Sequence, residues 1–257
     1  MFISESKSLV GVSIPKTGSR SIREAFSSAG LISFSGSPDR SDPLYQHSTA
    51  HHILLQMNNA GLNTENYNVC CVVRNPWERY FSFYKYAKEY IHKYKNKVEH
   101  INWDEAALRQ GKVLSDLYEK IKLYNDRASV DQIFFRSLIL RNRPQSDFIF
   151  NDRGENLISH ILKQETLQED FNSLCDALNI PRIELKTSNR SGMNWDISEI
   201  YSQELINIVS AKEKKIIELF NYDLTFPVSK NSFVNVSSAS EATESIDFSS
   251  INWGITI

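Results

Sequence analysis

The chain has 257 residues, of which 41% are hydrophobic, and its formal net charge is −2. This length accommodates one large domain or two small ones, with enough apolar residues to bury a sizeable core. The nearly neutral charge excludes the global positive field that is typical of nucleic-acid-binding proteins, so any anion site must be local.

The three cysteines, Cys70, Cys71 and Cys175, do not form the pattern of a disulfide framework. They suit a reducing compartment, as small buried hydrophobic residues. The first expected strand begins within roughly ten residues of the start, which leaves no room for a signal peptide. No run approaches the roughly 20 apolar residues of a membrane span. We therefore expect a cytoplasmic protein without a membrane span.

The first structural signal is a strand, a loop and a helix in direct succession. The apolar run 9–14 predicts a short buried strand, and apolar residues recur at helical spacing from Ile22 onward. The loop between them contains one glycine, three hydroxyls and two cations, in the order Pro15, Lys16, Thr17, Gly18, Ser19, Arg20 and Ser21. Free N–H groups and the positive dipole end make a helix N-terminus an anion site, suited to phosphate or sulfate.

This loop is not a Walker A motif, because Lys16 precedes Gly18 instead of following a glycine. The order Ile-Pro-Lys-Thr-Gly-Ser resembles the 5′-phosphosulfate loop of sulfotransferases, which use 3′-phosphoadenosine 5′-phosphosulfate (PAPS). The closest resemblance is to the branch with glycan 2-O-sulfotransferases and bacterial relatives. It implies that the loop binds the 5′-phosphosulfate and that Lys16 stabilises charge there. Taken alone, the loop also fits a plain strand-to-helix turn with a solvated lysine.

Three of the six histidines fall between positions 47 and 52. Ser48 or Thr49 is a suitable N-cap for a helix that runs to about Asn59. His47 lies at the mouth of this helix and His51 one turn further in, so the cluster fits surface histidines, a weak metal site or a general base. The resemblance favours the base, because a histidine in a segment similar to His-Ser-Thr-Ala lies in the family's acceptor cleft. His47 matches that position, and His51 is the second choice.

The second strong signal is the apolar run 67–73, which predicts an interior parallel strand ending at Arg74. A helix follows, with Asn75 as its cap and Pro76 at its first position. Ser82 lies two turns into this helix, so Arg74 and Ser82 can converge on one anion. A helix-capping arginine and a surface serine are the alternatives.

The segment RNPWERYFSFY resembles the family's 3′-phosphate element, Arg-x-Pro-x-x-Arg-x-x-Ser. The resemblance implies that Arg74 and Ser82 hold the 3′-phosphate of the nucleotide, a role that suits the planar fork of arginine. Arg79 is expected to pair with an acidic side chain instead. Because the strand ends in arginine and not in the aspartate of a Walker B strand, an ordinary Mg-dependent kinase is disfavoured.

The rest of the chain predicts mainly helices. The segment 80–94 is dense in aromatic residues, which indicates packing. We expect two or three helices over 103–110, 114–124 and 130–141, and a further helix over 167–178. Strand-like or short connecting elements are expected over 146–150 and 157–162, and a long amphipathic helix from Asp196 to about Phe220. Lys186 and Arg190 lie on a loop that resembles one folding over the nucleotide in the family. Glu165, at a strand end, is a reserve candidate for the base.

Together these signals predict one three-layer α/β/α domain over residues 1–228, with a mostly parallel central sheet and its ligand at the carboxyl ends of the strands. A Ser-rich tail, 229–257, follows, with a strand-like tip. The implied reaction moves a sulfuryl group from PAPS to an acceptor hydroxyl, with a glycan as the acceptor expected from the family and no metal. An ATP-dependent kinase and a non-catalytic module that binds the nucleotide or a sulfated glycan are the alternatives.

Overall fold

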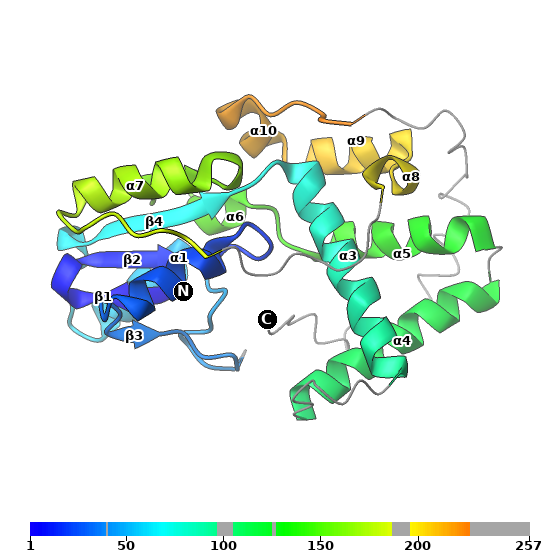
Figure 1. Ribbon diagram of the computed structural model, residues 1–257, viewed down its shortest axis with the longest axis horizontal. Coiled ribbons are helices and arrows are strands. Elements are labelled where there is room, and N and C mark those ends of the chain that lie inside the picture. The colour runs from blue at the N-terminus through cyan, green and yellow to red at the C-terminus, as the bar shows by residue number, and fades with distance from the viewer. Residues whose placement is uncertain (40, 97–104, 125–126, 187–195, 227–257) are drawn as a thin grey trace. The chain divides into compact units, whose positions relative to one another are not determined.

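The computed structural model describes residues 1–39, 41–96, 105–124, 127–186 and 196–226. The chain divides into two compact units, one of Met1–Asn75 with Pro144–Arg190 and one of Pro76–Arg143 with Ser191–Ile257. We call the first the sheet unit, because it contains the strands, and the second the helical unit, because its described elements are helices (Figure 1). The expected tail 229–257 lies outside the described residues.

The five strands of the sheet unit form one mixed sheet in the order β3-β1-β2-β4-β5. The strands are β1 (Phe2–Ser4), β2 (Leu9–Val12), β3 (Phe34–Ser35), β4 (Asn68–Val73) and β5 (His160–Lys163). β2, β4 and β5 run parallel, and β1 is antiparallel to both of its neighbours, so only β1 runs against the other four. The expected mostly parallel sheet is thus confirmed. The sequence does not indicate β1 and β3, because three and two residues are too short for a periodic pattern.

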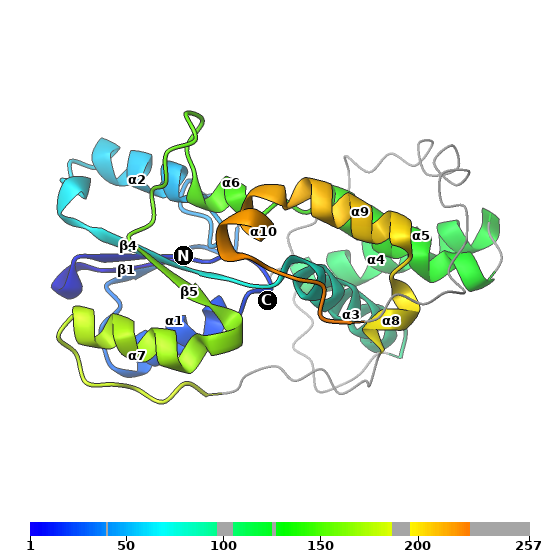
Figure 2. The same cartoon turned by 90° about the horizontal axis from the view of Figure 1, so that it is seen from above.

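Helices cover both faces of this sheet. α1 (Ser19–Ser28) and α7 (Leu167–Ala177) lie on one face, and α2 (Ala50–Asn59) and α6 (Ser146–Ile149) lie on the other (Figure 2). Phe26 of α1 meets Phe171 of α7 edge to face, with ring centroids 5.8 Å apart. Cys70 and Cys175 are buried in the same core as free thiols, and burial raises the pKa of Cys70 to about 12. The expected α/β/α layering is therefore present in the sheet unit.

Two details of the sheet unit concern α6 and the start of α7. Residues 146–149 form the short helix α6, so the strand-like or short connecting element expected over 146–150 is a connecting helix. The hydroxyl of Thr166 donates to Asp170 Oδ2 (3.0 Å) and makes no capping bond to the backbone of α7. Asp170 also accepts the N–H of Lys163 (2.7 Å), so this carboxylate joins the end of β5 to the start of α7.

The helical unit packs around aromatic side chains. Its described elements are α3 (Pro76–Lys95), α4 (Glu105–Tyr124), α5 (Arg127–Arg141), α8 (Ile197–Ile200), α9 (Gln203–Lys212) and α10 (Lys214–Phe220). Tyr84 of α3 and Tyr201 both meet the ring of Phe135 nearly edge on, with centroids 5.5 and 4.9 Å away. The buried hydroxyl of Tyr201 donates to the carbonyl of Trp77 (2.8 Å). The aromatic residues of segment 80–94 thus pack as predicted.

α4 runs without a break through Gly111, so of the two or three helices expected over 103–142 the described residues from Glu105 on form two, and the expected gap between 110 and 114 is absent. A β-carbon on Gly111 would lie 2.6 Å from Cδ2 and 2.9 Å from Cβ of Tyr94 on α3. The glycine is there because α3 and α4 approach closely at this point, and it does not end the helix.

We expect Gly111→Ala to destabilise the protein by about 1–3 kcal/mol, because the added methyl overpacks the contact with Tyr94. Alanine has a higher helix propensity than glycine, by about 1 kcal/mol. A variant more stable than wild type would therefore contradict the prediction and show that Tyr94 moves to accommodate the methyl group. Urea denaturation followed by circular dichroism measures the change. Lys112→Ala, at the exposed neighbouring position, is the control and should stay within about 0.5 kcal/mol of wild type.

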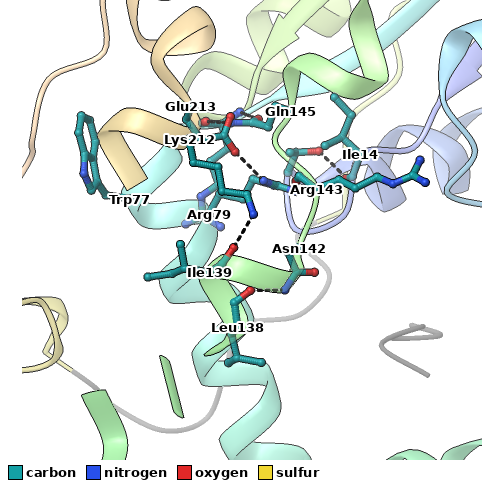
Figure 3. A network of polar contacts seen from close by, with 12 residues as sticks. Ile14, Trp77, Arg79, Leu138, Ile139, Asn142, Arg143, Gln145, Lys212 and Glu213 are labelled. Atoms are coloured by element: carbon teal, nitrogen blue, oxygen red, sulfur yellow. Dashed lines mark hydrogen bonds and ion pairs between the residues drawn. The ribbon is translucent and has the colours of Figure 1, made fainter. Parts of the chain in front are cut away.

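The long helix expected from Asp196 to about Phe220 is also wrong, because three short helices occupy this stretch. Ser202 Oγ accepts the N–H of Leu205 (3.3 Å) and caps α9. Glu213 separates α9 from α10 and is fully buried. Its carboxylate forms an ion pair with Arg79, with Glu213 Oε1 2.8 Å from Arg79 Nη1 (Figure 3), and this contact accounts for a charged residue in the core.

The same network joins the end of α5 to α9. Arg79 Nη2 donates to the carbonyl of Arg143 (3.0 Å), and Lys212 Nζ donates to the carbonyls of Ile139 (2.9 Å) and Leu140 (2.8 Å). The Ile139 and Leu140 carbonyls belong to the C-terminal turn of α5, where a cation is favourable. The expectation that Arg79 pairs with an acidic side chain is confirmed.

Candidate active site

The carboxyl ends of β2, β4 and β5 meet at one edge of the sheet unit, because the three strands are parallel and in register. Lys16 follows β2, Arg74 follows β4 and Glu165 follows β5. Ligands of open α/β sheets bind at this edge. The fold therefore brings two of the predicted cations and the reserve carboxylate to the same side of the sheet.

The loop after β2 is a tight turn held by its own hydroxyls. Thr17 Oγ1 and Ser19 Oγ both donate to the carbonyl of Ile14, at 2.9 and 3.3 Å, and Thr17 is fully buried. Gly18 (φ +89°) and Lys16 (φ +67°) are left-handed, which is unusual for a lysine and typical of functional loops. Because these two hydroxyls point to the loop's own backbone, the loop can offer a ligand its N–H groups and the Lys16 ammonium.

The loop leads directly into the N-terminus of α1. Gly18 is the N-cap and makes no side-chain cap, and the first turn contains no acidic residue. Such an end attracts anions. Arg20, one of the predicted binding residues, forms an exposed i,i+4 ion pair with Glu24 (2.6 Å). The backbone N–H of Ser21, which was among the N–H groups predicted to bind the anion, donates to the carbonyl of Gly18 (3.1 Å) and helps to close the turn.

His47 is tied to the end of β2. Its Nδ1 lies 2.7 Å from the carbonyl oxygen of Ser13, two residues before the loop, and its ring meets Tyr45 edge to face. Since a carbonyl only accepts, Nδ1 carries the proton, and in the neutral ring Nε2 is then an acceptor. Thr49 caps α2 by accepting from His52 N (3.2 Å), as expected. His51 is exposed on α2, so the structure links His47, and not His51, directly to the strand end.

The backbone after β4 is held by two side chains from elsewhere in the sheet unit. Gln145 Oε1 accepts the N–H of Arg74 and Gln145 Nε2 donates to its carbonyl, both at 2.9 Å. Glu165 Oε1 accepts the N–H of Asn75 (2.6 Å). Glu165, the reserve candidate for the base, therefore has a structural contact. The sequence does not single out Gln145, because one glutamine after a proline carries no recognisable pattern.

The remaining residues predicted to bind the nucleotide are Ser82, Lys186 and Arg190. Ser82 lies half-buried on α3 in the helical unit, whereas Arg74 belongs to the sheet unit, so their convergence on one phosphate stays a prediction. Lys186 is exposed in the sheet unit, and Arg190 lies outside the described residues.

The described residues contain no group of three or more His, Cys, Asp or Glu side chains placed to hold a metal ion. Within the same residues, none of the helices has the length and apolar character required to cross a membrane.

A largely parallel sheet with a glycine-containing loop and a helix N-terminus at its carboxyl edge is the arrangement of nucleotide-binding α/β proteins. The profile described as the Sulfotransferase family matches residues 1–224, so the chain belongs to the Sulfotransferase family. It is accordingly a PAPS-dependent transferase. Searches among curated proteins and among solved structures gave no significant match.

The residues at the strand ends fit this anionic co-substrate. The first turn of α1 is free of acidic residues, and the cations Lys16 and Arg74 follow neighbouring strands. A β-carbon at Gly18 would lie 3.4 Å from Gln164 and Leu167, so the loop packs against the start of α7. The donor set is that expected for a ligand with phosphate or sulfate groups.

Proposed function

We propose that the protein transfers the sulfuryl group of PAPS to a hydroxyl of a carbohydrate acceptor, with His47 as the general base. The observation that carries the proposal is the 2.7 Å contact between His47 Nδ1 and the Ser13 carbonyl. It ties the imidazole that we assign as the base to the strand that leads into the proposed anion-binding loop. The carbohydrate acceptor, and the glycan 2-O branch in particular, rest on the sequence resemblance of the loop and of the His-Ser-Thr-Ala segment.

The proposed role of His47 follows from its hydrogen bond. With Nδ1–H donating to Ser13, Nε2 is the nitrogen of the neutral ring that would accept the proton of an attacking hydroxyl. When Nε2 is protonated, the Ser13 carbonyl still accepts from Nδ1 and stabilises the imidazolium. The base therefore keeps its orientation in both protonation states.

The loop and Arg74 are proposed to bind the nucleotide. When bound, PAPS supplies a sulfuryl group attached to a phosphate leaving group. Lys16 and backbone N–H groups between Thr17 and Ser21 would stabilise negative charge that develops on the 5′-phosphate. Arg74, together with Ser82, would hold the 3′-phosphate. Lys186 and Arg190 are proposed as additional contacts.

The proposed location is the cytoplasm. It is supported by the three cysteines, which are buried and free where a secreted protein of this size would commonly use disulfides.

The nucleotide assignment is tested by calorimetric titration of adenosine 3′,5′-bisphosphate and, separately, adenosine 5′-phosphate, without magnesium. We expect a strong preference for the bisphosphate in the wild type. Arg74→Ala should reduce this preference by about 10- to 100-fold, because a charge-assisted contact with phosphate contributes about 1.5–3 kcal/mol. Arg153→Ala, which removes an exposed arginine of the sheet unit, should leave the preference unchanged. Equal affinity of the wild type for both nucleotides would refute the assigned 3′-phosphate site.

A further inference from the structure

The peptide groups of Arg74 lie just beyond the end of a buried strand. β4 pairs with β2 up to Cys71 and with β5 up to Val73, where its register with Lys163 ends. The next residue leaves both ladders, although buried backbone N–H and C=O groups need partners. Its side chain is the one that the proposed function assigns to the 3′-phosphate.

Gln145 supplies both of the partners that the strands no longer provide. Its side-chain carboxamide accepts the N–H of Arg74 and donates to the carbonyl of Arg74, each at 2.9 Å. The carboxamide thus imitates one rung of a β-ladder, with one donor and one acceptor in the same plane. Gln145 is fully buried, so its side chain has little freedom to turn away.

Glu165 secures the following residue. Its carboxylate accepts the N–H of Asn75 at 2.6 Å, a charge-assisted and therefore strong contact. Three hydrogen bonds from two side chains thus fix the two peptide groups that flank Cα of Arg74, because the Arg74 carbonyl and the Asn75 N–H belong to the same peptide group. The direction of a Cα–Cβ bond is set by the backbone on either side of it, so these contacts determine where the Arg74 side chain begins.

We propose that Gln145 is a positioning residue for nucleotide recognition, which holds the backbone of Arg74 so that its guanidinium meets the 3′-phosphate. This inference rests on the proposed role of Arg74. Gln145 would not touch the nucleotide and would act through Arg74 alone. A misplacement of about 1 Å in a binding group can cost about 10²-fold, so the effect should be large although the residue is remote from the ligand.

The test measures the ratio of the dissociation constants for adenosine 5′-phosphate and adenosine 3′,5′-bisphosphate. Gln145→Met keeps the volume but removes both hydrogen bonds, and we expect the ratio to fall by about 10- to 100-fold. Partial unfolding scales both affinities equally, so the ratio reports on positioning and not on stability. Gln132→Met, at a buried glutamine of α5 in the helical unit, is the matched control and should keep the wild-type ratio.

A double-mutant cycle with Arg74→Ala tests the route of the effect. If Gln145 acts through Arg74, the Arg74→Ala/Gln145→Met protein should show no lower ratio than Arg74→Ala alone. If Gln145→Met does not fold, the ratio of dissociation constants is measured for Gln145→Glu instead. It keeps an acceptor for the Arg74 N–H and loses the donor to its carbonyl, and we expect an intermediate ratio.

The measured ratios distinguish a failure of the proposed role of Arg74 from a failure of the proposed role of Gln145. A wild-type ratio near one, or a ratio unchanged by Arg74→Ala, overturns the role of Arg74 and the inference with it. A high wild-type ratio that Arg74→Ala abolishes, but that the Gln145 variants retain, overturns the inference alone. Equal weakening of both nucleotides in Gln145→Met would show a general structural role and would also overturn it.

Discussion

Replacing His47 by alanine is expected to lower kcat for sulfuryl transfer by a factor of about 10²–10⁴, because the acceptor hydroxyl would lose its general base. The affinity for adenosine 3′,5′-bisphosphate should stay within about twofold of wild type, because the proposed base acts on the acceptor and not on the nucleotide. Initial rates of transfer from PAPS to a glycan that the wild type accepts measure the first quantity, and calorimetry measures the second.

His92→Ala is the matched control, because His92 is exposed on α3 and, among the described residues, its ring contacts Asn96, just beyond the end of that helix. It should retain wild-type kcat. His51→Ala decides between the two candidate bases, and a larger loss of kcat there than in His47→Ala would contradict the assignment. Undiminished turnover in His47→Ala would remove the base from the mechanism. The alternative of a non-catalytic binding module predicts no turnover by any of these proteins.

Glu213→Ala is expected to destabilise the protein by about 3–5 kcal/mol, the largest stability effect that the described residues suggest. The side chains of Arg79 and Glu213 are 1% and 0% exposed, and their contact is 2.8 Å long. Removing the carboxylate leaves the guanidinium buried with its hydrogen bond to the Arg143 carbonyl but without a counter-charge. Urea denaturation with linear extrapolation measures the loss.

Two further variants show what the buried pair contributes. Glu204→Ala breaks the partly exposed pair with Arg136 (3.5 Å) and should cost no more than about 1 kcal/mol. The double variant Arg79→Met/Glu213→Leu should recover most of the loss, because apolar side chains can replace a buried ion pair at little cost. A loss below about 1 kcal/mol in Glu213→Ala would mean that water reaches the pair, contrary to its burial.

The candidate site was predictable where its signals are local. The strand 9–14, the loop from Pro15 to Ser21 and the following helix are encoded within about 20 successive residues, by apolar periodicity and by the glycine and hydroxyls of the turn. The structure reproduces this order as β2, loop and α1. The cap at Thr49 and the strand before Arg74 were readable for the same reason.

Other features depend on pairs of residues that are far apart in the chain. Gln145 contacts a residue 71 positions away, and the contact exists only because the fold brings the start of α6 to the end of β4. β1 and β3 are strands because β2 provides a neighbour for β1, which in turn provides one for β3. Neither short strand has a pattern of its own.

The sequence alone determined the order of the main elements, the predicted anion-binding loop and the candidate residues Lys16, His47 and Arg74. The tertiary structure decided which histidine is tied to the strand end, how the backbone of Arg74 is held and where helices break. Apolar periodicity continues through Glu213, yet the helix is interrupted there, where the carboxylate pairs with Arg79, 134 positions away. Local propensity amounts to a few tenths of a kcal/mol per residue, whereas leaving one buried charge unpaired costs about ten times more, so the long-range contact prevails.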